Sequence, residues 1–344
     1  MMKSVVFILL LSYIILRKVL GGINMTQKIG LEVANGFIKV VSKDNELIYP
    51  NKLKALTGSE FSVVGDLGVI YEFEGRKYVL DNKGISSGGR SSNRYLTQDY
   101  LLELLIAVSH VITERNVVLT IGVPCRDFEN QKLKEKMIKH LSGKHTLYIT
   151  SNGEKEEFII NITKLYIVCE PLGTLCDFVF NERLEIVNQR NQFNYVIVDI
   201  GYSTTDILAT NGLQVDKLAG DDIGCMDIVN ELVRQMNVKY QDTDYHFTHS
   251  DVSSEIDPII TKYGKTFRFD KELDEIKMSV ALELDAAIRR SGVNLSHYDR
   301  IIYTGGGALA LKNHIELRDN AIIYPESQIA NARGFYKFSL IKED

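Results

Sequence analysis

The sequence has little cysteine. Cys125, Cys169, Cys176 and Cys225 are the only four among 344 residues, and no two of them have C-x-x-C spacing. Zinc ribbons, thioredoxin-like redox motifs and disulfide frameworks need cysteines that are closer together or more numerous. We therefore expect reduced, partly buried thiols in a cytosolic protein.

The sequence also has no excess of positive charge. Lysine and arginine total 40 against 45 aspartates and glutamates, which gives a formal net charge of −5. Such a balance leaves no general basic surface for the phosphates of a nucleic acid, so direct nucleic-acid binding is not expected. The G-x-G-x-x-G and G-x-x-x-x-G-K-[ST] spacings are missing as well, which argues against a dinucleotide-binding fold and a P-loop.

The composition that is present is typical of a globular protein, with 45% hydrophobic and 25% charged residues. The length favours two domains. Residues 1–24 form an apolar N-terminal extension whose run from Val5 to Leu16 is shorter than the about 20 residues that a membrane span needs. No obvious cleavage site follows this run. We expect Met25 to be the true start, and a short membrane anchor on residues 1–24 is the alternative.

The rest of the chain predicts an α/β unit that occurs twice. Ile29–Val33 and Phe37–Ser42 are apolar runs joined through Asn35-Gly36, a pair that tolerates positive φ and favours a tight hairpin turn. A similar pair of runs, Tyr195–Ile200 and Ile207–Thr210, opens the second half. Apolar residues at helical spacing predict helices at 98–113, 226–236 and 271–290, the last of which should stop at Gly292.

The sharpest motif is VIVDIGYSTTD at residues 196–206. An apolar strand ends at Asp199 and runs into a turn with a glycine and the hydroxyls of Ser203, Thr204 and Thr205. The backbone N–H groups and hydroxyls of such a turn suit an anion, and a carboxylate beside them can hold a hydrated cation. The stretch predicts a phosphate and magnesium site, and a polar turn that satisfies its own backbone is the alternative.

Three further segments carry weaker signals. The first hairpin places Glu32 at a strand end and Lys39 within reach of a phosphate. The three glycines at residues 305–307 follow an apolar strand and leave no side chain in the way of a base or ribose. The N-terminus of a helix after them would favour negative charge. Glu170 precedes Pro171 at an expected helix start. Each segment alone would be an ordinary hairpin, turn or solvated carboxylate.

Taken together and in this order, these segments of residues 25–344 resemble the nucleotide-binding signature of the actin, sugar-kinase and heat-shock-chaperone ATPase superfamily. TIGVPCRDF at 120–128, CEPLG at 169–173 and ANARGFYK at 330–337 are most similar to bacterial actin-like proteins of the ParM/StbA plasmid-segregation type. The resemblance implies an α/β, actin-like (ribonuclease-H-like) fold of two duplicated domains with a nucleotide cleft between them. Domain I would comprise residues 25–168, completed by 325–344, and domain II residues 169–324.

The resemblance also implies roles for single residues. Glu170 would orient the attacking water, and Asp199 and Glu32 would act in catalysis by holding Mg²⁺ through water. ATP, with GTP as an open alternative, would be bound by Ala34, Asn35, Gly36, Lys39, Gly201, Tyr202, Ser203, Thr204, Thr205, Asp222, Gly305, Gly306, Gly307 and Ala308.

Two positions depart from the family's pattern. Glu32 stands where the family usually has aspartate, and Ala34 stands where it usually has glycine. Slow hydrolysis, altered metal geometry or nucleotide binding without turnover would follow from a looser first loop.

The function implied by the resemblance is that of a cytoplasmic, Mg-dependent ATPase. It would polymerise with itself into filaments and move plasmid DNA through a separate DNA-binding adaptor protein at a centromere-like site. One alternative is a kinase of the same superfamily that acts on a sugar or a small acid. The other is a membrane-tethered actin-like scaffold, which requires that residues 1–24 are retained.

Overall fold

The computed structural model describes residues 26–57, 68–81, 91–252 and 256–342. The apolar N-terminal extension and the expected start at Met25 lie outside the described residues. Within the described part of the chain, every helix is too short or too polar to cross a membrane.

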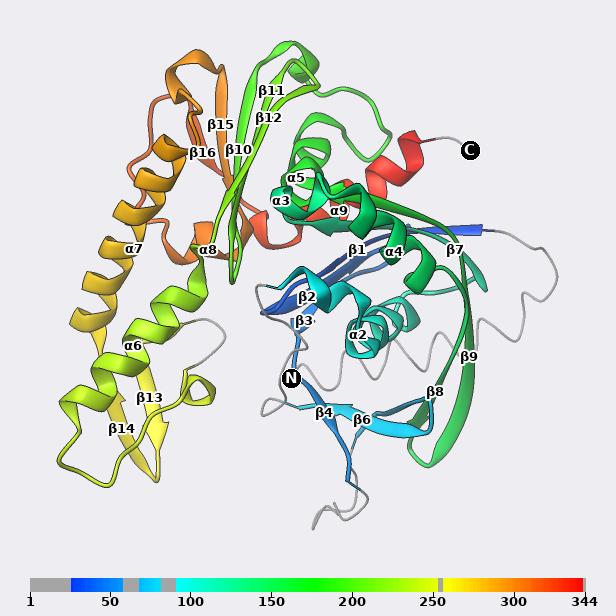
Figure 1. The fold of residues 1–344 in the computed structure, drawn as a ribbon, viewed down its shortest axis with the longest axis horizontal. Helices are drawn as coiled ribbons and strands as arrows, with labels where there is room; N and C mark the ends of the chain where they lie inside the picture. The colour runs from blue at the N-terminus through cyan, green and yellow to red at the C-terminus, as the bar shows by residue number, and fades with distance from the viewer. Residues whose placement is uncertain (1–25, 58–67, 82–90, 253–255, 343–344) are drawn as a thin grey trace.

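The described residues form two lobes, each built on a large β-sheet (Figure 1). The strands of the first sheet are β1 (Thr26–Val33), β2 (Phe37–Val41), β3 (Glu46–Pro50), β4 (Leu53–Ala55), β5 (Ile70–Phe73), β6 (Arg76–Leu80), β7 (Asn116–Val123), β8 (Gly143–Ser151) and β9 (Glu154–Cys169). The strands of the second sheet are β10 (Tyr195–Ile200), β11 (Thr205–Asn211), β12 (Gln214–Asp221), β15 (Arg300–Thr304) and β16 (Ala321–Ile323). A separate hairpin consists of β13 (Ile259–Lys262) and β14 (Lys265–Arg268).

The α-helices flank these sheets, and short 3₁₀ helices lie between them. The α-helices are α2 (Gln98–Ser109), α3 (Cys125–Phe128), α4 (Gln131–Leu141), α5 (Glu170–Val179), α6 (Cys225–Lys239), α7 (Asp270–Arg290), α8 (Gly305–Ala310) and α9 (Ser327–Ile341). The 3₁₀ helices are η1 (Ser92–Leu96), η2 (Arg190–Gln192), η3 (His249–Asp251) and η4 (Leu295–His297).

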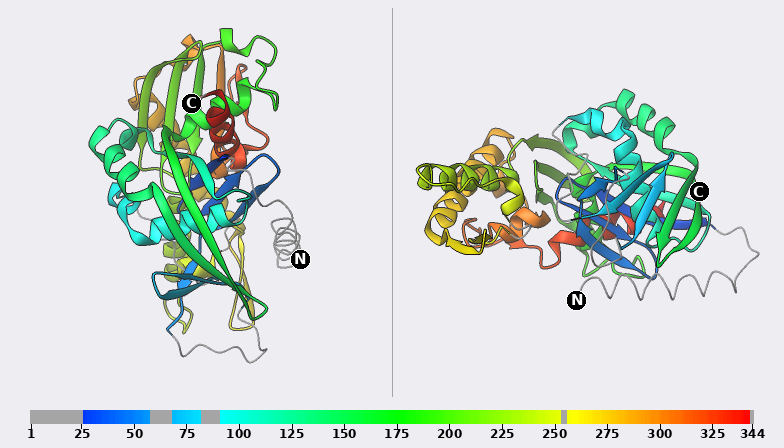
Figure 2. Two further views of the ribbon diagram at one scale, coloured as in Figure 1. Left: turned by 90° about the vertical axis from the view of Figure 1, so that its right-hand side faces the viewer. Right: turned by 90° about the horizontal axis from the view of Figure 1, so that it is seen from below.

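The predicted duplication is confirmed by the strand order. The first sheet runs β3-β2-β1-β7-β9 before it continues into β8-β5-β6-β4, and the second runs β12-β11-β10-β15-β16. In both, an antiparallel three-strand meander is followed by two strands that lie parallel to its first strand. Seen from below, the two lobes lie side by side, with α6, α7 and the β13–β14 hairpin in the second (Figure 2).

The predicted helices form, with small shifts at their ends. The first ends at Ser109 rather than at residue 113, the second extends to residues 225–239, and the third is α7. Gly292, the predicted stop of α7, has φ +72°, a conformation that glycine adopts without strain.

The turn at Asn35-Gly36 is tight, because Ala34 and Phe37 are joined across it by a backbone hydrogen bond. Both residues tolerate positive φ, but neither has it here. Gly36 does pack closely against the opposite lobe: a Cβ on it would lie 3.3 Å from the side chain of Tyr202, a tight contact.

Each face of the second sheet is covered by helix. Along β10, Val196, Val198 and Ile200 belong to the core that includes α6 and α7. Tyr195 and Ile197 face the other way, into a smaller core with residues of α5. This alternation is what the two-residue period of a strand requires of a sheet buried on both sides.

Helices α5 and α9 connect the lobes (Figure 1). Helix α9 packs on the first sheet, α5 packs on the second, and the two helices cross each other. At the crossing the backbones touch, because a Cβ added to Gly334 would lie 1.7 Å from the carbonyl oxygen of Gly173. A partly buried ion pair of 2.6 Å between Lys337 and Asp177 joins the same two helices about one turn further along.

Candidate functional site

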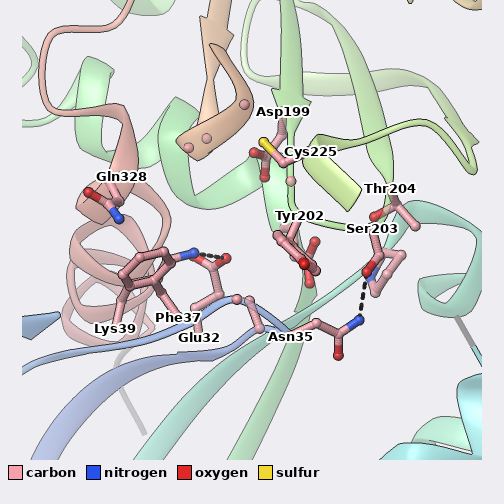
Figure 3. Close-up of a pocket in the computed structure, with 18 of the residues that line it drawn as sticks. Glu32, Asn35, Phe37, Lys39, Asp199, Tyr202, Ser203, Thr204, Cys225 and Gln328 are labelled. Carbon is pink, nitrogen blue, oxygen red and sulfur yellow. Dashed lines mark hydrogen bonds and ion pairs between the residues drawn. The ribbon is translucent and has the colours of Figure 1, made fainter. Parts of the chain in front are cut away.

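A cavity of about 700 Å³ opens between the two meanders, where the hairpin of each half reaches toward the other. Most of the predicted site residues line it (Figure 3). These are Glu32, Ala34, Asn35, Gly36, Lys39, Glu170, Asp199, Gly201, Tyr202, Ser203, Thr204, Gly305, Gly306 and Gly307. Segments that are more than 250 residues apart in the chain thus meet at one place.

Three predicted residues do not line the cavity. Thr205 is buried behind it, where its hydroxyl donates to the carbonyl oxygen of Ile223 at 2.8 Å. Ala308 is fully buried in α8. Asp222 is half-exposed and forms a 2.6 Å ion pair with Arg126, a residue of the cavity wall.

The first hairpin carries a buried ion pair. Glu32 and Lys39 are register partners on β1 and β2, and Lys39 Nζ lies 2.6 Å from Glu32 Oε1. Burial lowers the pKa of Lys39, but the charge of Glu32 and its hydrogen bond outweigh that effect and leave the pKa raised. Lys39 is therefore charged and already partnered, so a phosphate in the cavity would share it with Glu32.

The two hairpin loops touch across the cavity. Asn35 Nδ2 donates to Ser203 Oγ at 2.8 Å (Figure 3). The second loop is closed on itself, since the N–H of Gly201 donates to the carbonyl oxygen of Thr204 at 2.8 Å. The departure at Ala34 causes no backbone strain, because φ at this residue is not positive.

Arg94 is a cavity residue that the sequence analysis missed. Its guanidinium donates to Asn35 Oδ1 and, at 2.7 Å, to the carbonyl oxygen of Val33. It also lies over the rings of Tyr95 and Tyr100, with 5.5 and 5.3 Å to the centroids. Its buried Nε has no hydrogen-bond partner in the described chain. Arg94 lies on η1 in SSNRYL, a stretch with no motif that could have identified it.

Carboxylates gather at the base of the cavity, where Glu170 and Asp199 line it and Asp206 is buried next to Asp199. Asp199 is the penultimate residue of β10, Asp206 is its register partner on β11, and Glu170 begins α5. Burial, reinforced by Glu32, raises the pKa of Asp199 to about 7. Burial also raises the pKa of Asp206 to about 6 and that of Glu170 well above its ordinary value.

A hard cation would suit this donor set, because carboxylate oxygens are its preferred protein ligands and its charge would offset the mutual repulsion. Among the described residues, however, no group of three or more histidine, cysteine, aspartate or glutamate side chains could hold a metal ion. Most ligands of a cation here would therefore be water or oxygens of a bound molecule.

The three glycines are themselves the first turn of α8, rather than a loop ahead of it. Gly305 has φ +83°, and a Cβ on it would lie 2.4 Å from Asp199 Oδ1. A Cβ on Gly307 would lie 2.3 Å from Ile200 Cγ2. Gly306 has no described atom within 4 Å of its Cβ position, so it alone of the three faces open space. Two of the glycines are therefore needed for packing on β10.

Two family models match the chain. Residues 30–173 match the N-terminal domain of actin-like proteins, and residues 197–317 match the C-terminal domain of archaeal MreB-like actin homologues. A comparison with curated protein sequences finds no match.

Solved structures show the same fold. Apo ParM of pSK41 is 20% identical with a TM-score of 0.64, over 93% of this chain and 98% of that one. An archaeal actin homologue in complex with ADP is 19% identical with a TM-score of 0.69, over 92% and 100% of the chains. A subunit of a 15-stranded ParM filament from Clostridium botulinum is 17% identical with a TM-score of 0.73, over 92% and 99%. With two matched domains and this fold, the chain belongs to the actin-like proteins.

Proposed function

We propose that the chain binds ATP together with Mg²⁺ in the cavity between its lobes and hydrolyses the nucleotide, with GTP as the alternative substrate. The observation that carries this proposal is the pairing of two matched hairpin loops across one cavity, with buried carboxylates at its base. The ADP complex of the archaeal actin homologue supports nucleotide binding in this fold.

The basic and the acidic residues of the cavity would have different roles. Lys39, Arg94 and the N–H groups of the two loops would bind the phosphates, and Ser203 would donate to them from the second lobe. Asp199, with Glu32 beside it, would hold Mg²⁺ through water, and the bound ion would neutralise phosphate charge. Asp222 would steady the rim of the site through Arg126. Thr205 and Ala308, which are buried behind the cavity wall, would support the residues that line it.

Glu170 would orient a water at the terminal phosphate. It is the first residue of α5, it lines the cavity, and its high pKa favours the protonated form when the cavity holds no cation. A nearby cation would lower that pKa and let the carboxylate accept a hydrogen bond from water. The ion pair that engages Glu32 with Lys39 supports slow rather than fast turnover.

We further propose that nucleotide binding drives polymerisation with other copies of the chain. The similarity to a ParM filament subunit supports self-assembly. The filament would act in the cytoplasm, where ATP is abundant. It would move plasmid DNA through a DNA-binding adaptor protein, because a net charge of −5 disfavours direct contact with DNA.

Sedimentation combined with phosphate release tests this proposal. Wild type, Asp199→Asn, Glu170→Gln and the exposed control Asp242→Asn are compared with ATP, GTP and a non-hydrolysable analogue. We expect nucleotide-dependent pelleting that Asp199→Asn abolishes, whereas Glu170→Gln pellets but releases little phosphate. Asp242→Asn should behave as wild type.

Two other outcomes would redirect the assignment. Turnover without pelleting would favour the small-molecule kinase, and a panel of sugars and acids would then stimulate ADP release. Co-pelleting of bare plasmid DNA with the filaments would contradict the need for an adaptor.

A further inference from the structure

A buried chain of hydrogen bonds runs from Asp199 to both helices that connect the lobes. Asn331 on α9 donates from Nδ2 to Asp199 Oδ2 at 2.6 Å. Thr174 on α5 donates to Asn331 Oδ1 from its N–H at 3.1 Å and from its hydroxyl at 2.8 Å. The Thr174 hydroxyl also lies 2.9 Å from that of Thr304, at the end of β15. All four side chains are at most 4% exposed.

The backbone N–H of Thr174 determines which groups donate and which accept in this series of hydrogen bonds. The N–H of Thr174 can only donate, so the atom of Asn331 that faces it must be the amide oxygen. The amide nitrogen must then face Asp199, where it donates to one carboxylate oxygen. Asn331 thus has its acceptor on α5 and its donor directed at the second lobe.

The contacts leave Asp199 a single orientation. Oδ2 is bound to Asn331, and Oδ1 lies on the side of Gly305, where even an added Cβ would approach to 2.4 Å. Without the amide, the carboxylate would be free to rotate about its χ2 torsion. A second group that holds a metal-binding carboxylate in place typically changes metal affinity by about 10- to 100-fold.

We propose that Asn331, held by Thr174, is a positioning residue that orients the Asp199 carboxylate for the cation of the bound nucleotide, an inference that rests on the proposed function. Asn331 reaches Asp199 from α9, whose packing is on the first sheet. The cation-binding carboxylate of one lobe is therefore aligned by a side chain of the other.

The test compares Mg²⁺-dependent binding of a fluorescent ADP with its binding in EDTA, in the full chain. Asn331→Ala and Thr174→Val should need about tenfold more Mg²⁺ for half-maximal binding, while the affinity in EDTA stays within about twofold of wild type. Thr174→Ser keeps the hydroxyl and should restore the wild-type Mg²⁺ dependence. Ser339→Ala is the matched control, because it removes a buried hydroxyl of α9 that bonds only to Tyr336 among the hydrogen bonds of the described chain.

Thermal unfolding in EDTA is measured for every variant alongside ADP binding. If Asn331→Ala does not fold, the comparison of Thr174→Val with Thr174→Ser tests the positioning role. A wild-type Mg²⁺ dependence in Thr174→Val, or an equal loss of affinity with and without Mg²⁺, would overturn the positioning role. If wild type itself shows no Mg²⁺-dependent ADP binding, the proposed function fails and this inference with it. The wild-type measurement therefore separates the two failures.

Discussion

The side-chain amide of Asn35 donates a 2.8 Å hydrogen bond to the hydroxyl of Ser203, 168 residues further along the chain. This contact joins the hairpin loops of the two duplicated halves at the cavity. If both groups also bind phosphate, removal of either should weaken ATP binding by roughly 1 kcal/mol, about fivefold.

A double-mutant cycle of Asn35→Ala and Ser203→Ala, read out by ATP titration, measures the coupling. We expect the double variant to lose less than the sum of the single losses, because each single change already breaks the shared contact. Strict additivity would show that the two loops bind ATP independently.

Arg94 should matter for the phosphates rather than for the nucleoside. Arg94→Lys keeps the charge but loses the planar fork that binds Asn35 and the backbone of β1. We expect about a tenfold loss of ATP affinity in Arg94→Lys and a larger loss in Arg94→Ala, with adenosine binding unchanged in both. Calorimetric titration with the two ligands checks this, and equal losses for ATP and adenosine would argue against a phosphate contact.

The glycine triplet provides a matched pair of variants. Gly305→Ala introduces a clash with Asp199 and a strained positive φ, so it should destabilise the fold by about 2 kcal/mol or more. Gly306→Ala meets no described atom within 4 Å, so it should fold normally and lose nucleotide affinity instead. Urea unfolding and ADP titration on both variants separate the effects. A stable Gly305→Ala would contradict the packing described for α8.

The raised pKa of Asp199 predicts a pH dependence of stability in the nucleotide-free protein. Because the folded state keeps a proton on Asp199 up to about pH 7, against an ordinary value of 3.8, folding binds more protons over this range. The contribution of Asp199 to the free energy of unfolding should therefore be fully present at low pH and be lost as the pH rises to about 7.

Comparison with Asp199→Asn isolates this group from the other carboxylates. The free energy of unfolding of wild type minus that of the variant, from urea titrations in EDTA, should fall between about pH 4 and 7 by at most about 1.4 kcal/mol per pH unit. Above pH 7 it should be constant. A difference that rises with pH would show that Asp199 is stabilised in its ionised form.

The sequence predicted the parts of the fold that follow a local pattern. The apolar runs predicted the first two strands of each meander, and the sequence VIVDIGYSTTD predicted a strand that ends at Asp199, one residue before the end of β10. Helical spacing placed α7 to within one residue of its start.

Features that depend on contacts between distant segments could not be predicted from a local sequence pattern. Arg94 occurs in a stretch without a motif, and its role depends on Tyr95, Tyr100 and a hairpin about 60 residues earlier. The glycine triplet was recognised, but its packing role depends on how closely β10 approaches α8. Asn331 lies in the ANARGF stretch, yet nothing in this local sequence shows that its amide is directed at Asp199.

The bare contact between Gly173 and Gly334 bears on how the lobes can move. The contact leaves no room for a side chain on either glycine, and the Lys337–Asp177 ion pair and the Thr174–Asn331 hydrogen bonds join the same two helices beside it. Asn331 lies about one turn from this contact on α9. We therefore expect that a rotation of one lobe against the other would break the Asn35–Ser203 hydrogen bond before it disturbs the Asn331–Asp199 hydrogen bond.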